Sequence, residues 1–203
     1  MRNSFHAALF APVLVLWATA VQAQGYLGLG LGQSKIPDQP PSSCAEFGLP
    51  STCTLSKKDT DSAFRIFGGV RFGQNFALEM GFVDLGKGHV NITSPVVATA
   101  DFKVSGFDIS GIGFVPFGAN FGGMARVGLL SWTAKPSVTG AGGTASGSDN
   151  GISLAFGLGL TYEFSRQFGG RLEWQRFVKV GNNDTTGTTD IDFLSLNGVI
   201  RFW

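Results

Sequence analysis

Hydrophobic and polar side chains alternate with a period of two along most of this chain. In the stretch 194–203, apolar and polar positions alternate as in a β-strand with two different faces. The apolar face carries Leu194, Leu196, Ile200 and Phe202, and the other face carries Ser195, Asn197 and Arg201. Seven other stretches have the same pattern. Together they predict eight strands, at 26–32, 63–72, 76–82, 102–115, 122–133, 152–162, 170–180 and 194–203.

The connections between the predicted strands alternate between long and short. The long ones cover residues 35–61, 86–100, 134–150 and 181–189, and the Gly-, Ser- and Thr-rich composition of the third predicts a mobile loop. With an even number of strands, both termini lie on the side of the short turns. Bacterial outer-membrane barrels have short periplasmic turns and longer external loops. The pattern therefore predicts an all-β fold, an eight-stranded antiparallel up-and-down transmembrane β-barrel in the outer membrane, with both termini in the periplasm.

Aromatic residues border each of the three short turns. The segments 72–76, 117–121 and 164–168 all begin and end with Phe, and strand parity puts these side chains on the apolar face. Aromatic rings are favoured at the boundary between a bilayer and water, although Phe could also simply favour strand ends. We expect an aromatic girdle at the periplasmic interface, formed by Phe72, Phe76, Phe117, Phe121, Phe164, Phe168, Phe202 and Trp203. The last two residues are also expected to act as an assembly signal.

The polar face carries nine charged residues. They are Arg65, Arg71, Glu79, Asp108, Arg126, Glu163, Arg171, Glu173 and Arg201. An eight-stranded barrel has an interior just wide enough for side chains to fill, so these charges are expected to form a network of ion pairs in the lumen. Glu79 and Glu173 could instead be a catalytic carboxylate pair, but neighbouring arginines explain them more simply. We predict no catalytic residue and no wide porin-like pore, while a narrow or gated path for ions stays open.

Composition supports a membrane barrel over other classes of protein. Charged residues make up 14% of the chain, whereas Gly contributes 30 residues and Phe 19. Beyond the first residues, no segment is apolar over the length that a membrane-spanning helix needs. The formal net charge of +1 gives no electrostatic support for a nucleic-acid partner. The sequence predicts one domain after the export signal, without a cofactor or a metal site.

The first residues predict an export signal. Arg2 supplies a positive charge, residues 7–18 form a short apolar core, and Val21-Gln22-Ala23 fits a small-residue cleavage site. The chain therefore divides into a signal peptide, 1–23, and an outer-membrane barrel domain, 24–203. An alternative cleavage site, Ala18-Thr19-Ala20, stays open.

Both cysteines lie in the first long loop. In an exported protein, Cys44 and Cys53 are expected to form a disulfide, because this environment is oxidising. Two lone cysteines are a poor metal site. The expected bridge is structural and narrows the base of a loop.

Two polar residues could serve other roles. His89, the only histidine after the signal, precedes Ser94 in a loop, and a few small outer-membrane barrels that modify lipid A use such residues. A single loop histidine is more often polar surface, so we predict no enzyme. Arg176 falls on the apolar face, where it is expected near the outer interface and could meet lipopolysaccharide phosphate.

Several segments resemble a known family. The stretch from Gly169 to Gln175, Gly-Gly-Arg-Leu-Glu-Trp-Gln, resembles the seventh strand of the membrane domain of outer-membrane protein A. Residues 61–69 and 79–86 look like the second and third strands of its small-barrel relatives. The resemblance implies an eight-stranded barrel with internal salt bridges, in which Glu79 and Arg171 match lumen-facing charges.

The resemblance also has two departures. No peptidoglycan-binding domain is expected after Trp203, so a tether to the cell wall is not predicted. The last residue is Trp, where the assembly signal usually has Phe, although Phe202 stands beside it on the apolar face.

Together, the pattern and the resemblance predict a structural, non-enzymatic barrel that supports envelope integrity and displays surface loops. A narrow ion or small-solute channel and a surface adhesin are the alternatives. The expected partners are outer-membrane lipid and lipopolysaccharide, the barrel-assembly machinery during insertion, and host surface molecules if the loops are adhesive.

Overall fold

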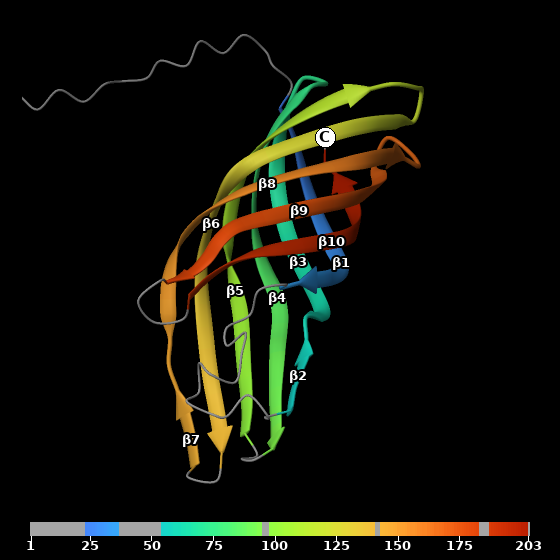
Figure 1. Cartoon of the computed structure of the whole chain (residues 1–203). Coiled ribbons are helices and arrows are strands. Elements are labelled where there is room, and N and C mark those ends of the chain that lie inside the picture. Colours follow the sequence, from blue (N-terminus) through green and yellow to red (C-terminus); the bar gives the residue numbers. More distant parts are fainter. Residues whose placement is uncertain (1–22, 37–53, 95–97, 141–142, 183–186, 203) are drawn as a thin grey trace, which may run out of the picture.

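The computed structural model describes residues 23–36, 54–94, 98–140, 143–182 and 187–202, which form an antiparallel sheet closed into a barrel (Figure 1). The eight barrel strands are β1 (Ala23–Lys35), β3 (Thr60–Phe72), β4 (Phe76–Ser94), β5 (Ala98–Pro116), β6 (Phe121–Gly140), β8 (Asp149–Glu163), β9 (Phe168–Asn182) and β10 (Gly187–Arg201). Each barrel strand pairs with the next, and β1 pairs with β10, which closes the sheet. The predicted eight-stranded fold is confirmed. Within the described residues, no helix is long and apolar enough to cross a membrane.

Strands β4, β5 and β6 run past the barrel wall and continue the same sheet as an open part with five strands, which we call the extension. Its order is β2–β4–β5–β6–β7, with β2 (Thr54–Lys58) and β7 (Gly143–Ser146) as short outer strands (Figure 1). The prediction of loops at 86–100 and 134–150 is therefore wrong, because most residues of both segments belong to paired strands. Their composition suggested coil, but residues 98–103 find backbone partners on both β4 and β6.

The extension leaves the barrel at a bulge in β4. The register with β5 shifts between Asp84 and Lys87, where Gly86 has a φ of 74°. This left-handed conformation favours glycine, and a Cβ here would come within 2.6 Å of the Ser62 carbonyl oxygen. The Lys87 amide donates to Asp61 Oδ2 at 2.7 Å. A carboxylate on β3 therefore holds the bulge in place.

The three short turns lie at the opposite end of the barrel, which we call the turn end. Each turn is tied to the next barrel strand by its third inner residue. The carbonyls of Asn75, Asn120 and Gln167 accept hydrogen bonds from the amides of Phe114, Glu163 and Arg201, at 2.7, 2.9 and 2.9 Å. The repeated turn sequence thus corresponds to a repeated contact.

Apolar side chains point outward from the barrel wall, and polar ones point into the lumen. Leu196 and Phe107 are each 69% exposed, whereas Arg65 and Glu173 are fully buried. A water-soluble barrel would have the opposite arrangement. The predicted division between the two faces of each strand agrees with this structure.

Candidate functional site

Six of the nine predicted lumen charges meet in one buried layer, which we call the ion layer. They project from five strands, and none is more than 6% exposed. They are Arg65, Glu79, Asp108, Arg126, Arg171 and Glu173. Three guanidinium groups face three carboxylates, so their formal charges cancel.

Glu79 is the centre of the ion layer. Its Oε1 accepts hydrogen bonds from Arg65 Nη1 at 2.7 Å and from Arg126 Nη2 at 2.8 Å. Its Oε2 accepts from Arg171 Nη1 at 2.8 Å and from the Tyr26 hydroxyl at 2.9 Å. One buried carboxylate therefore has four donors, which offset the cost of removing it from water.

The two other acids complete the pairing. Arg65 donates to Asp108 from Nε at 3.0 Å and from Nη2 at 2.7 Å, the two-point geometry that suits a guanidinium and a carboxylate. Arg126 pairs with Glu173 as well as with Glu79. The two glutamates considered as a catalytic pair are thus bridged by one arginine and buried. This geometry is that of an ion network.

An aromatic layer lies on the turn-end side of the ion layer. Its buried members are Tyr26, Phe67, Ala77, Ile112, Phe114, Met124 and Val199. The guanidinium carbon of Arg171 lies 5.0 Å from the Tyr26 ring centroid and 5.5 Å from that of Phe114. Such contacts between a cation and ring faces add to the stability of a desolvated arginine.

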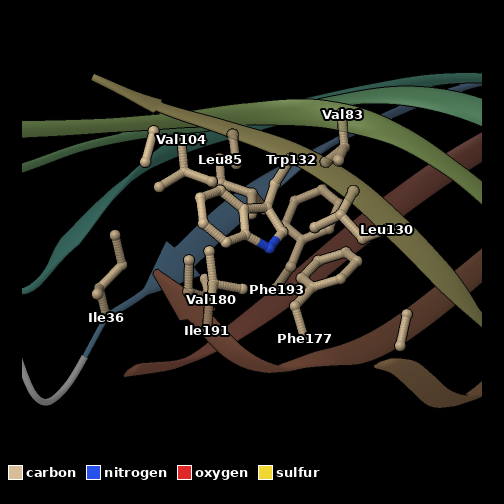
Figure 2. Close-up of a cluster of buried hydrophobic side chains, with 13 residues drawn as sticks. Ile36, Val83, Leu85, Val104, Leu130, Trp132, Phe177, Val180, Ile191 and Phe193 are labelled. Carbon is tan, nitrogen blue, oxygen red and sulfur yellow. The ribbon is translucent and has the colours of Figure 1, made fainter. Parts of the chain in front are cut away.

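An apolar layer fills the lumen on the other side of the ion layer. It contains Ile36, Ala63, Val83, Leu85, Val104, Leu130, Trp132, Ala134, Ala155, Phe177, Val180, Ile191 and Phe193. Figure 2 shows the Trp132 side chain among residues from β4, β5, β9 and β10. The indole Nε1 donates to Ser153 Oγ at 2.8 Å, so its polar atom is satisfied.

The sequence prediction missed this apolar layer. Phe177 and Phe193 have the same strand parity as Glu173 and Ser195 and are fully buried or nearly so. Strand parity alone places both side chains in the lumen, although a lumen filled with ion pairs does not require them.

A bulge in β9 helps to build the apolar layer. Lys179 has a φ of 53°, and the register with β10 shifts between Thr189 and Ile191. The Lys179 amide donates to Asp190 Oδ1 at 3.0 Å. Because of the extra residue, both Phe177 and Val180 are buried, although simple alternation would separate them.

Glycines of β1 provide the space for the lumen side chains. A Cβ on Gly28 would come within 2.2 Å of the Phe67 ring, and one on Gly30 within 2.1 Å of Asn197 Oδ1. In the Leu–Gly alternation of β1, the leucines form the apolar outer face. The glycines leave room on the inner face for the aromatic and polar groups opposite.

The remaining three predicted lumen charges form a separate cluster at the turn end. Arg201 Nη2 lies 2.9 Å from Glu163 Oε1, and Arg71 Nη1 lies 3.5 Å from the same oxygen. The Glu163 side chain is 42% exposed, so this cluster borders solvent.

Aromatic side chains surround the turn end on the outside. Seven predicted girdle residues are between 46% and 69% exposed: Phe72, Phe76, Phe117, Phe121, Phe164, Phe168 and Phe202. Trp203 lies outside the described residues, as do Cys44 and Cys53 and therefore the expected disulfide.

Ion pairs mark the other edge of the apolar outer surface. Arg176 pairs with Asp192 at 2.7 Å, and Lys103 pairs with Asp84 at 2.8 Å. Arg176 follows the girdle residue Phe168 by eight positions. At about 3.3 Å per residue and a tilt of about 40°, this gives roughly 20 Å across the apolar surface.

His89 lies beyond this edge, on the extension. Its ring Nδ1 is hydrogen-bonded to Asp101, and both side chains are partly exposed. The side chain of Ser94 lies outside the described residues. Among the residues that the structure describes, no three His, Cys, Asp or Glu side chains come together as a metal site.

Removing the charge of Glu79 should destabilise the barrel strongly. The E79Q variant leaves three buried guanidinium groups without their shared carboxylate, which should lower the free energy of unfolding by about 3–5 kcal/mol. Urea unfolding in lipid vesicles measures this change. The matched control is E163Q at the turn end, where a partly exposed carboxylate should contribute about 1 kcal/mol or less. Equal losses in both variants would contradict a special role for the ion layer.

Known proteins similar to this chain are bacterial outer-membrane proteins. Outer membrane protein A of Yersinia pseudotuberculosis serotype I (strain IP32953) is 30% identical over 208 residues, covering 97% of this chain and 55% of that protein. The chain thus spans about half the length of this relative.

Solved structures support the fold. Neisserial surface protein A (NspA) superimposes with a TM-score of 0.59 at 16% identity, covering 88% of this chain and 97% of that one. Ail of Yersinia pestis, in complex with the heparin analogue sucrose octasulfate, has a TM-score of 0.55 at 15% identity, covering 89% and 99%.

The family description "OmpA-like transmembrane domain" matches residues 20–203. This match covers every described strand, including the strands that supply the ion layer. The chain therefore belongs to the OmpA-like transmembrane domain family and is a β-barrel of the bacterial outer membrane.

Proposed function

We propose that this protein is a non-enzymatic, non-conducting structural barrel that supports the integrity of the outer membrane. The observation that carries this proposal is the filled lumen. The aromatic layer, the ion layer and the apolar layer follow one another along the barrel, and Trp132, Phe177 and Phe193 in the apolar layer are at most 4% exposed.

Two physical barriers oppose ion conduction through this lumen. An ion in the apolar layer would lose its hydration shell without gaining a polar partner, as at the hydrophobic gates of channels. An ion in the next layer would have to displace arginine–carboxylate pairs that already satisfy each other. Both barriers favour the structural function over the alternative of a narrow channel.

The proposal includes an orientation. The turn end would face the periplasm and the extension the exterior, because outer-membrane barrels have short periplasmic turns and long external segments. Export through a signal at 1–23, a Cys44–Cys53 bridge and insertion by the barrel-assembly machinery belong to the same proposal. The exposed Phe202 at the end of β10 supports that last step.

Conductance in planar bilayers tests the closed lumen. Wild-type protein should give no current steps, and the W132A/F177A variant should stay closed as well, because the ion layer still blocks the lumen when two large side chains leave the apolar layer. The matched control is F107A, which removes an exposed aromatic side chain from the outer surface. Steps of equal size in wild-type protein and W132A/F177A would refute the structural proposal in favour of a channel.

A row of lysines supports lipopolysaccharide as a partner. Lys87 lies opposite Lys103 on the outer face, and Lys103, which pairs with Asp84, lies opposite Lys135. Like charges on opposite strand positions are unfavourable, and the single carboxylate of Asp84 offsets only part of the three positive charges, so a further anion would be favourable. We propose that phosphate groups of the outer leaflet supply this anion, since this row would stand at headgroup level.

The lysine row should determine binding of lipopolysaccharide. The K87Q/K103Q/K135Q variant should bind it more weakly, by about 1 kcal/mol for each lysine removed from an anionic surface. A titration of detergent-solubilised protein with lipopolysaccharide measures the affinity. K179Q, on β9, controls for the loss of charge at the same end. If the triple variant bound lipopolysaccharide as tightly as the wild type, the lysine row would not be the binding site.

Adhesion to host molecules is a second candidate function. The extension ends in the outer strands β2 and β7, each paired on one side within the described residues. Such edges can accept a strand from another protein. Removing residues 137–146 should then reduce binding to host matrix while heat-modifiable mobility stays unchanged. Unaltered adhesion would exclude this candidate.

A further inference from the structure

The turn end of the barrel contains a chamber that neither the ion layer nor the proposed function uses. Its volume is about 470 Å³, and it is open on one side. Phe114 of the aromatic layer separates it from the ion layer. Its polar lining includes Gln24, Arg71, Gln74, Asn120, Glu163, Arg166 and Arg201.

The lining of the chamber has an excess of positive charge. Three arginines, Arg71, Arg166 and Arg201, face one acid, Glu163, so the formal balance is 3 − 1 = +2. Arg71 and Arg201 both approach the same carboxylate oxygen, Oε1 of Glu163. One carboxylate therefore neutralises only part of the charge of the two guanidinium groups.

Arg71 is held in position but retains an unused donor. Its guanidinium carbon lies 4.5 Å from the Phe114 ring centroid, and its Nη2 donates to the Gln74 carbonyl at 2.6 Å. Its Nε is buried and has no hydrogen-bond partner among the described residues. A pre-positioned guanidinium loses little conformational freedom when it binds a ligand.

We propose that this chamber is a binding site for a small oxyanion of the phosphate class. Guanidinium groups bind phosphate through paired N–H donors, and the side-chain amides of Gln24, Gln74 and Asn120 add neutral donors around them. A phosphate dianion matches the formal charge of +2 in the lining. The ligand enters from the aqueous side at the turn end and stops at the aromatic layer, so the site is compatible with a closed lumen.

Titration of the detergent-purified protein with inorganic phosphate, followed by calorimetry, tests the site. R71Q and R201Q should each weaken binding about tenfold, the equivalent of one charge-assisted hydrogen bond. E163Q should tighten it, because the competing carboxylate charge is gone. A parallel titration with glutarate tests carboxylates, which should bind more weakly.

Two variants keep the test decisive. R166Q changes an exposed side chain in the β8–β9 turn, so it should fold normally and still weaken binding. R176Q removes an arginine from the outer surface and should bind phosphate as the wild type does. Equal affinity in R71Q, R201Q, R166Q and R176Q would overturn the proposal, as would weaker binding by E163Q or tighter binding of glutarate. None of these outcomes depends on whether the lumen conducts.

Discussion

The buried carboxylate of Glu79 is the constraint on which the interior of this barrel depends. It accepts hydrogen bonds from three arginines and one tyrosine, all within the barrel wall. A charge this deep is costly unless every partner is in place. The partners in turn require space, and the glycines at 28 and 30 provide it because β1 has no inward-pointing side chain at these two positions. The alternation of Leu and Gly in β1 is thus part of the same arrangement as the arginines on β3, β6 and β9.

The ion layer also explains the order of the layers around it. The aromatic layer places ring faces against Arg171, so that a guanidinium removed from water still has favourable contacts. The apolar layer covers the other side and keeps water away from the ion pairs. Shielding strengthens electrostatic attraction, because the effective dielectric constant falls. The same shielding closes the lumen, which connects the stability of the barrel with the proposed lack of conductance.

Strand alternation was sufficient to predict the fold, the outward apolar face and the residues that form the ion layer. Alternation predicts these features because a strand directs successive side chains to opposite faces. It could not predict the extension, since residues 134–140 resemble coil in composition and are strand through pairing with β5, β7 and β8. It also could not assign Val180 to the lumen, because the bulge at Lys179 interrupts the period of two. Both failures concern pairing between segments, which a single strand does not reveal.

The two bulges show how the barrel changes from a closed lumen to an open sheet. The β4 bulge at Gly86 and the β9 bulge at Lys179 each adjoin a member of the apolar layer, Leu85 and Val180 respectively. A bulge adds a residue and bends its strand. The β9 bulge turns Val180 inward, whereas Leu85 in β4 keeps the strand parity of the buried Val83. Beyond the β4 bulge, β3 no longer pairs with β4, and β2 takes over that edge. In β4, the apolar layer therefore ends at Leu85, directly before the bulge at which the wall begins to open.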